Sequence, residues 1–182
     1  MTAIETTRLR LRPVQPADAA LLPGLVTEKI GAMTASWPWP LTREAADRRV
    51  AETIAANADG GQFSRLIEHR ADGAPMGWLG VTRRSADPQS GMLGYWLTDA
   101  FHGKGFLTEA LQAFVPAAIA VLALQRLEAG ARPDNAASIA ALQRLGMRFH
   151  EQRLHYVPAR ACEEPTNFYR LTVVSSAFSP SR

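Results

Sequence analysis

The sequence predicts a single α/β domain over residues 1–182, with a mixed central sheet of about seven strands flanked by about four helices. A chain of 182 residues with 47% hydrophobic and 20% charged residues can bury roughly 70% of its unfolded surface in one core. Segments with the alternating spacing of strands and segments with the three-to-four spacing of helices follow one another along it. The run from Leu93 to Ala131 is predicted to be strand, helix, strand, which is long enough for a crossover between parallel strands.

Composition and charge exclude several classes of protein. The 20 basic and 17 acidic residues give a net charge of only +3, and the arginines are scattered, which argues against a nucleic-acid-binding protein. No apolar run approaches the ~18 residues of a membrane helix, and the N-terminus lacks the pattern of a signal peptide. We therefore expect a cytoplasmic protein without a membrane partner. Cys162 is the only cysteine, which excludes an internal disulfide and a cysteine-rich zinc site.

The first third of the chain is predicted to contain one strand and two helices. Leucine alternates with arginine from Arg8 to Pro13, a pattern typical of a half-buried strand. Helices are expected at Asp18–Val26 and Thr42–Ala56, and Thr42 is a favourable capping residue for the second.

Two tryptophans lie between these helices, in the segment SWPWPLT (residues 36–42). Its prolines remove backbone donors and favour an extended loop, so Trp37 and Trp39 are carried on that loop. They either fill the core or line a substrate pocket, because rigid aromatic side chains on loops often form recognition surfaces. Both interpretations stay open at this point.

The middle of the chain is predicted to form an antiparallel meander followed by a long helix. Strands are expected at Gln62–His69, Met76–Arg84 and Gly91–Thr98. Apolar residues then recur at three-to-four spacing from Gly105 to Leu122, which indicates an amphipathic helix, and Pro116 is expected to kink it.

The last third is predicted to contain a strand, a helix and two further strands. The strand covers Arg126–Ala131, and the helix runs from the segment RPDNAAS to Leu145, with Gly146 as a left-handed cap. The final strands are expected at Arg148–Val157 and Asn167–Ser175.

The segment DAFHGKGFLTEAL (residues 99–111) is the most informative about chemistry. Gly103 and Gly105 allow the backbone to turn tightly and to bring its N–H groups close to a ligand. The free amides and the positive dipole end of the following helix then form an anion site suited to phosphate, with Lys104 at its mouth. The same glycines are equally consistent with a tight turn that binds nothing.

Two known phosphate motifs fit this segment poorly. A P-loop requires Ser or Thr after its lysine, but Gly105 follows Lys104. A dinucleotide fingerprint requires glycine where Thr108 stands, and an acidic residue at the end of the next strand, whereas Glu128 lies near that strand's beginning. Dinucleotide binding is kept as an alternative.

A third pattern fits better. The segments GYWL, HGKGFLTEAL and RLEAGARPDNAASIAALQRLGM together resemble the GNAT superfamily of acetyl-CoA-dependent N-acyltransferases. The opening TTRLRLRPVQPADA and the WPWPLT loop resemble its branch of ribosomal-protein N-terminal (alanine and serine) acetyltransferases, and the likeness extends to about Phe149. It implies a GNAT-like fold in which the parallel central strands Leu93–Thr98 and Arg126–Ala131 splay apart, with acetyl-CoA as cosubstrate and no metal.

The resemblance also implies which positions bind the coenzyme. The superfamily's pyrophosphate loop and the helix start after it align with His102, Gly103, Lys104, Gly105, Phe106, Leu107 and Thr108. His102 replaces the usual glutamine or arginine. Leu107 replaces a small residue, and its extra bulk could tighten the site for the pyrophosphate.

The pantetheine arm is expected in the gap between the splayed strands. There the backbone of Trp96, Leu97 and Thr98 would pair with the acetyl and pantetheine end as an added strand would. Asn135 matches an asparagine that contacts the pantetheine arm in the superfamily, and Ser138 lies near the same end of the coenzyme. Asn135 also suits a helix N-cap, and the two roles are equally favoured here.

Direct transfer requires a polarised carbonyl and a proton donor for the thiolate. The N–H near Leu97 is expected to polarise the carbonyl as an oxyanion hole. Many superfamily members carry a donor tyrosine where this chain has Leu142. In the resembling branch the proposed donor matches Ser138, whose hydroxyl could instead bond the backbone of the first helical turn.

Transfer also requires a general base and an acceptor pocket. The candidate for the base is Glu151, with His155, His150 and Glu68 as alternatives, since Glu151 and His155 lie four apart on a strand and share one face. The acceptor pocket is predicted to contain the following aromatic residues: Trp37, Trp39 and Tyr95.

The sequence therefore predicts an enzyme that transfers an acetyl group from acetyl-CoA directly to a primary amine. The acceptor is expected to be a protein N-terminus or a small-molecule amine. One alternative is a non-catalytic acyl-CoA-binding module, motivated by Leu107 and Leu142, and another is a dinucleotide-binding protein. A homodimer is expected by analogy with the family alone.

Overall fold

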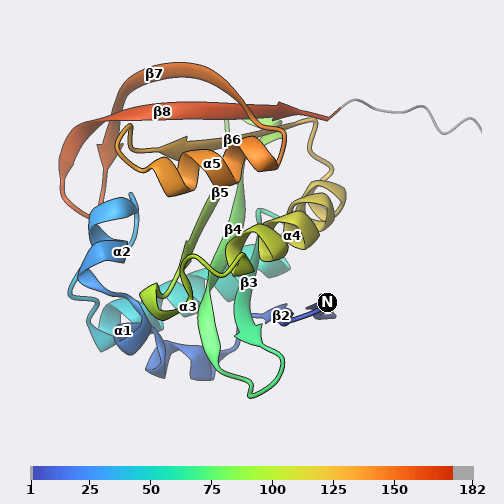
Figure 1. Cartoon of the computed structure of the whole chain (residues 1–182), viewed down its shortest axis with the longest axis vertical. Coiled ribbons are helices and arrows are strands. Elements are labelled where there is room, and N and C mark those ends of the chain that lie inside the picture. Colours follow the sequence, from blue (N-terminus) through green and yellow to red (C-terminus); the bar gives the residue numbers. More distant parts are fainter. Residues whose placement is uncertain (1, 174–182) are drawn as a thin grey trace, which may run out of the picture.

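Eight strands form one mixed sheet in the computed structural model, which describes residues 2–173 (Figure 1). Their order across the sheet is β1-β2-β3-β4-β5-β6-β8-β7. The strands are β1 (Ile4–Glu5), β2 (Leu9–Pro13), β3 (Gln62–His69), β4 (Pro75–Arg84), β5 (Asp87–Leu97), β6 (Arg126–Ala131), β7 (Arg148–Val157) and β8 (Cys162–Thr172). The α-helices in this part of the chain are α1 (Leu22–Leu25), α2 (Glu28–Met33), α3 (Arg43–Ala58), α4 (Phe106–Leu122) and α5 (Ala136–Arg144).

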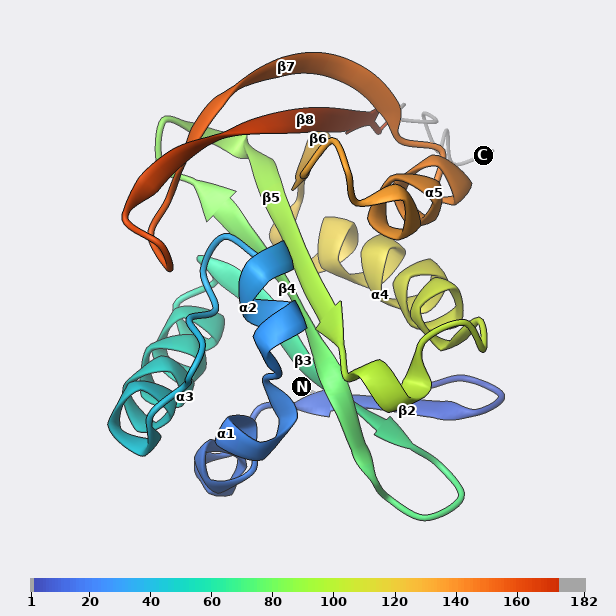
Figure 2. The ribbon, with the colours of Figure 1, turned by 60° about the vertical axis from the view of Figure 1, so that its left-hand side comes forward.

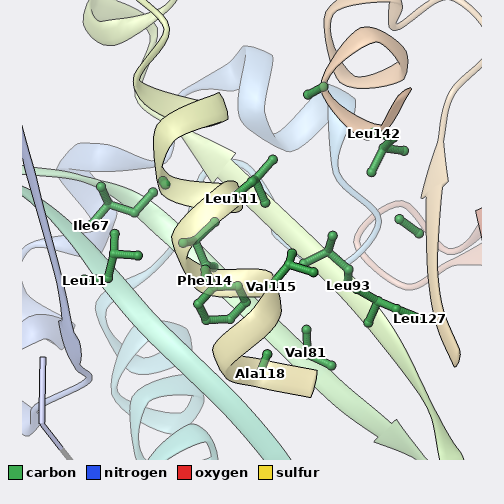
Figure 3. Packing of buried hydrophobic residues seen from close by; sticks show 14 of the residues in the cluster. Leu11, Ile67, Val81, Leu93, Leu111, Phe114, Val115, Ala118, Leu127 and Leu142 are labelled. Carbon is green, nitrogen blue, oxygen red and sulfur yellow. The ribbon is translucent and has the colours of Figure 1, made fainter. Parts of the chain in front are cut away.

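The helices cover both faces of the sheet (Figure 2). Helices α1, α2 and α3 lie on one face, and α4 and α5 lie on the other. On the second face Leu111, Phe114 and Ala118 of α4 are fully buried among side chains of the strands (Figure 3). The three-to-four spacing that predicted this helix is therefore the spacing of its core-facing residues. None of the helices within residues 2–173 is long and apolar enough to cross a membrane.

The centre of the sheet contains its one parallel pair among the described strands, β5 and β6. Their pairing runs from Ser90 opposite Arg126 to Leu93 opposite Ala129 and stops there. Strand β5 nevertheless continues to Leu97, still paired with β4 on its other side. The two strands thus part after four paired residues, which confirms the predicted splay.

The structure confirms the predicted order of elements and adds short ones. Strand β1 and helix α2 were not predicted, because two and six residues are too few to show a period. The helix predicted at Asp18–Val26 is instead a 3-10 turn at Pro16–Ala20 followed by α1, since Pro23 lies at the start of a new helical turn and not inside one. Helix α4 runs through Pro116 to Leu122 without a break.

Two strands begin earlier than predicted. Strand β5 begins at Asp87, in a segment predicted to be a loop, because the Asp87 carboxylate accepts hydrogen bonds from Ser90 and Arg126 and holds the segment beside β6. Strand β8 begins at Cys162 and contains Pro165, which lies beyond the end of β6 and has a strand partner on one side only. Its predicted end at Ser175 lies outside the described residues.

Candidate active site

A cavity of about 1300 Å³ lies where β5 and β6 part. One wall is formed by the loop of residues 99–105, the start of α4 and the start of α5. The opposite wall is formed by α2, the loop after it and the turn between β7 and β8. The gap in the sheet therefore opens into a space between two helix starts and a hairpin.

The start of α4 is built as an anion-binding cradle. Gly103 and Gly105 adopt left-handed conformations, with φ of 73° and 76°, which an L side chain would strain. Gly105 is the N-cap residue, and no side chain of residues 2–173 caps this end of α4. The amides of Phe106, Leu107 and Thr108 therefore point toward the cavity mouth without a side-chain acceptor, which favours an anion there.

Most of the predicted coenzyme-binding residues line this cavity, and two do not. Lys104 turns away because its Nζ donates to the carbonyl of Ala100 at 3.0 Å. Thr98 turns away because its Oγ1 donates to the carbonyl of Leu25 at 3.3 Å. Leu107 lines the cavity and also packs against the main hydrophobic cluster, so part of its bulk is absorbed by the core.

His102 connects the loop to strand β5. Its Nε2 lies 2.7 Å from the Leu97 carbonyl oxygen, and its Nδ1 lies 3.7 Å from the Asp99 carboxylate. Because the carbonyl can only accept, Nε2 carries the hydrogen in this contact. The residue that departs from the family pattern thus ties the anion cradle to the strand that borders the gap.

Arg8, just before β2, supports the cradle, and no pattern in the sequence predicts this role. Its backbone N and its Nε donate to the Glu109 carboxylate at 2.8 and 2.7 Å. Its Nη1 donates to the Lys104 carbonyl at 3.0 Å, and its guanidinium lies 4.3 Å from the centre of the Phe106 ring. Arg8 therefore fixes the loop and the first turn of α4 together.

Glu109 lies beside the buried Ala110 and Leu111 in the helical spacing, which predicts a side chain that faces solvent, and this prediction is wrong. Its carboxylate is half-buried and also accepts from Thr6 Oγ1 at 2.6 Å. Burial alone would raise the pKa of Glu109, but the hydrogen bonds from Thr6 and Arg8 outweigh it and lower the pKa. The carboxylate is thus ionised and held by the turn between β1 and β2, about a hundred residues earlier in the chain.

Replacing Arg8 by alanine is expected to weaken coenzyme A binding about tenfold, because the loss of charge-assisted bonds to the loop frees the cradle to move. Isothermal titration of coenzyme A measures this. The matched control is Arg10→Ala, which removes an exposed arginine two residues further along, in β2, that pairs with Glu5 instead. Equal affinities for the two variants would contradict a supporting role for Arg8.

The backbone of β5 presents unpaired groups to the gap. The amide of Thr98 donates to the Met76 carbonyl at 2.7 Å, on the β4 side. Backbone groups alternate between the two sides of a strand, so the N–H and C=O of Leu97 point the other way, into the gap. Because His102 donates a hydrogen bond to the Leu97 carbonyl, the N–H is the backbone group of Leu97 that remains to face the gap, where β6 no longer pairs.

The start of α5 faces the same gap. Asn135 caps this helix, because its Oδ1 accepts from the amide of Ser138 at 3.1 Å. The Ser138 hydroxyl lies 2.7 Å from the hydroxyl of Tyr95, which comes from β5. Burial raises the pKa of the Tyr95 phenol to about 12, so the phenol is protonated at neutral pH. The capping role of Asn135 is thus present, and its pantetheine contact stays a prediction.

The two loop tryptophans have different surroundings. Trp37 is buried, with its ring 5.3 Å from that of Trp78 and 5.2 Å from that of Trp96, and it also lines the cavity. Trp39 is 52% exposed and does not line the cavity. Its Cβ lies close over Gly31, where a larger side chain would collide with it. Trp37 and Tyr95 therefore line the cavity and Trp39 does not, and the acceptor-pocket role of Trp37 and Tyr95 stays a prediction.

Of the candidate bases, His155 alone lines the cavity. Glu151 lies four residues before His155, about 13 Å away along the strand, and does not line the cavity. It pairs with Arg153 instead. Glu68 is held by Arg12, away from the cavity. Burial, with the nearby charges of Arg153 and then Arg84, lowers the pKa of His155. Its imidazole is therefore neutral at pH 7.

Ion pairs close the cavity wall on the hairpin side. Arg160 donates to the Thr34 carbonyl at 2.9 Å, at the end of α2, and its Nε donates to the Glu164 carboxylate at 2.6 Å. Arg132 also donates to Glu164, at 3.3 Å. The pKa of Glu164 is lowered, first by the bond from Arg160. Through Arg160 and Arg132, Glu164 therefore connects the end of α2, the β7–β8 hairpin and the end of β6. Within residues 2–173, no cluster of His, Cys, Asp or Glu is arranged to hold a metal ion.

Comparison with known proteins identifies a family of domains that this chain matches. The family model "Acetyltransferase (GNAT) domain" matches residues 8–148. "Probable N-acetyltransferase YjcK" of Bacillus subtilis is 41% identical over 64 residues, which are 35% of this chain and 34% of that protein. The chain thus matches about a third of the length of this curated relative.

Solved structures share the whole fold at low sequence identity. The ribosomal-protein-S5-alanine acetyltransferase from Vibrio fischeri superposes with a TM-score of 0.81 at 16% identity, covering 99% of this chain and 100% of that one. The ribosomal L7/L12 alpha-N-protein acetyltransferase RimL, in complex with coenzyme A, superposes with a TM-score of 0.79 at 23% identity, covering 94% and 98%. These similarities show the fold.

Proposed function

Because the chain belongs to the acetyltransferase (GNAT) domain family, we propose that it transfers the acetyl group of acetyl-CoA directly to a primary amine. The observation that carries this proposal is the cavity, which connects an uncapped helix start to a gap in the sheet. An anion cradle beside unpaired strand backbone matches a molecule with a diphosphate at one end and amide groups along its arm.

The residues present fit acetyl-CoA at both ends. The diphosphate would lie against the amides from Gly103 to Thr108, which carry no side-chain acceptor. The pantetheine arm would lie in the gap, where Leu97 offers its N–H and Asn135 lines the opposite side. Bound acetyl-CoA supplies the activated acetyl group.

The Leu97 N–H and Ser138 are proposed to act on the thioester. A backbone N–H fixed in the gap stabilises negative charge as it develops on the carbonyl oxygen. The Ser138 hydroxyl, at the first turn of α5, donates a hydrogen bond to the departing sulphur atom. Both groups are held by the fold before the substrate arrives, which lowers the cost of reorganisation.

His155 is proposed as the general base in place of Glu151. An ammonium group with a pKa near 10.4 is almost fully protonated at pH 7, so an amine acceptor must lose a proton before or during attack. His155 is neutral, lines the cavity and rests against Phe168, with ring centres 5.5 Å apart. Glu151 is ion-paired with Arg153 and does not line the cavity.

The acceptor is proposed to enter from the side of α2 and the β7–β8 turn. Trp37, Met33 and Tyr156 give this side an apolar, aromatic lining. Similarity to proteins whose names describe acetylation of ribosomal-protein N-termini makes an N-terminal peptide the first acceptor to test. Small-molecule amines remain part of the proposal.

The proposal is tested by measuring release of free thiol from acetyl-CoA with a panel of N-terminal peptides and small amines. Turnover with at least one amine, with an acetylated product of the expected mass, is the expected result. Tight coenzyme A binding without turnover across the panel would favour the non-catalytic binding module instead. Stabilisation against heat by NAD(P) but not by coenzyme A would favour dinucleotide binding.

The dependence of kcat on pH is expected to report His155. A general base acts in its neutral form, so kcat should rise with pH through a midpoint below 6.5, because the pKa of His155 is lowered. Replacing Arg153 by methionine removes one of the charges that lower this pKa, so the acid limb should move to higher pH while the plateau is unchanged. The control Arg148→Met removes an exposed arginine of the same strand. An unmoved acid limb in Arg153→Met would contradict the assignment.

A further inference from the structure

A phenol and a serine hydroxyl meet across the gap in the sheet. Tyr95 comes from β5 and Ser138 from the first turn of α5, and their oxygen atoms lie 2.7 Å apart. The Tyr95 hydroxyl can also donate to the Ser138 carbonyl oxygen, but at 3.4 Å that contact is much longer than the one to the Ser138 hydroxyl. Both residues line the cavity, so this pair borders the space proposed for the thioester.

The Ser138 hydroxyl is held from outside its own helix. A serine in the first turn of a helix commonly bonds a nearby backbone group. Here its backbone amide donates to the Asn135 side chain. Within residues 2–173, its hydroxyl forms a hydrogen bond with Tyr95. Leu142, one turn further along α5, is fully buried hydrocarbon and offers no hydroxyl. The orientation of the Ser138 hydroxyl therefore depends on the strand opposite.

The direction of this hydrogen bond decides where the serine hydrogen points. A hydroxyl has one hydrogen, so when Tyr95 donates to Ser138 Oγ, the hydrogen of Ser138 is free to point elsewhere. Burial keeps the phenol in its protonated form at neutral pH, and it can then serve as that donor. In that arrangement the serine hydrogen is free to point into the cavity, which Ser138 lines.

We propose that Tyr95 is a positioning residue that holds the Ser138 hydroxyl with its hydrogen directed at the departing sulphur atom. This inference rests on the proposed function. When the C–S bond breaks, its electron pair leaves with sulphur as a thiolate, which accepts a hydrogen bond from Ser138, while the proton lost by the attacking amine goes to His155, so that total charge is conserved. Tyr95 itself gives up no proton, because a buried phenol is a weaker acid than a thiol with a pKa near 8.5.

Three variants test the pair: Tyr95→Phe, Ser138→Ala and the double variant. Tyr95→Phe is expected to lower kcat about tenfold, since the Ser138 hydroxyl loses its fixed direction and its hydrogen bond to the developing thiolate weakens, while the Kd of coenzyme A stays within threefold. Ser138→Ala should lower kcat at least as much. The double variant should be no slower than Ser138→Ala, because Tyr95 acts only through Ser138.

The control Tyr169→Phe removes the hydroxyl of a buried tyrosine on β8 that does not line the cavity, and its kcat should be unchanged. A normal kcat in Tyr95→Phe, or multiplied losses in the double variant, would overturn the inference while acetyl transfer itself still stood. Absence of turnover in the unaltered enzyme with every amine tested would instead remove the proposed function.

Discussion

Gly105→Asp is expected to abolish measurable coenzyme A binding, by at least about 100-fold, while the chain stays folded. A Cβ at this position would meet only Arg8 Nη2, at 3.5 Å, so the side chain has room. Its carboxylate would then lie at the helix start and beside a guanidinium, in the place proposed for the diphosphate. The variant would carry its own competing anion.

Stability should change little in this variant. A non-glycine residue at φ of 76° costs about 1–2 kcal/mol, and an acidic group at a helix N-terminus returns about 0.3–1 kcal/mol. Isothermal titration with coenzyme A and a thermal melt measure the two effects separately.

Gly60→Asp is the matched control. Gly60 also has a positive φ, of 71°, and open space around its Cβ, but it lies in the turn after α3, away from the cavity. It adds the same charge and similar strain without approaching the cradle. If both variants bound coenzyme A normally, or both lost it, the helix start would not be the diphosphate site.

His155→Gln is expected to lower kcat by 100-fold or more, within the range of ~10²–10⁴ that general-base catalysis contributes. Glutamine keeps a polar group in the cavity but cannot take up a proton at neutral pH. The Kd of coenzyme A should be unchanged, because His155 lies on the acceptor side of the cavity. Steady-state kinetics with a saturating amine give the comparison.

The control for this substitution is His150→Gln. His150 lies on the same strand, is exposed and does not line the cavity, so its kcat should match that of the unaltered enzyme. A residual rate in His155→Gln that rises steeply at alkaline pH, where the amine deprotonates unaided, would agree with the role. Full turnover at pH 7 would exclude His155 as the base.

Local signals in the sequence were sufficient for most of the fold. The glycines at 103 and 105, the helical period up to Leu122 and the cap at Gly146 each depend on neighbours within a few residues, and the structure has all three. The splay of β5 and β6 was reached through family resemblance, since no residue pattern marks the point where strand pairing stops.

Parts of the site depend on contacts between distant residues, which the sequence does not display. Arg8 meets Glu109 across 101 positions, and Tyr95 meets Ser138 across 43. Trp37 is buried against Trp78 and Trp96 while Trp39 is exposed, a difference set by contacts with strands far along the chain. Glu151 and His155 share a strand face, yet only the position of the hairpin relative to the cavity separates them.

The early parting of β5 from β6 links the durability of this enzyme to its substrate. A ligand that binds only the folded chain adds about 2.7 kcal/mol to folding at a concentration of 100 times its Kd. A molecule that completes the hydrogen bonding of an interior strand edge is such a ligand. If acetyl-CoA binds in this gap, we expect its scarcity to leave more of the population transiently open to proteases, so that added acetyl-CoA should slow proteolysis of the folded chain.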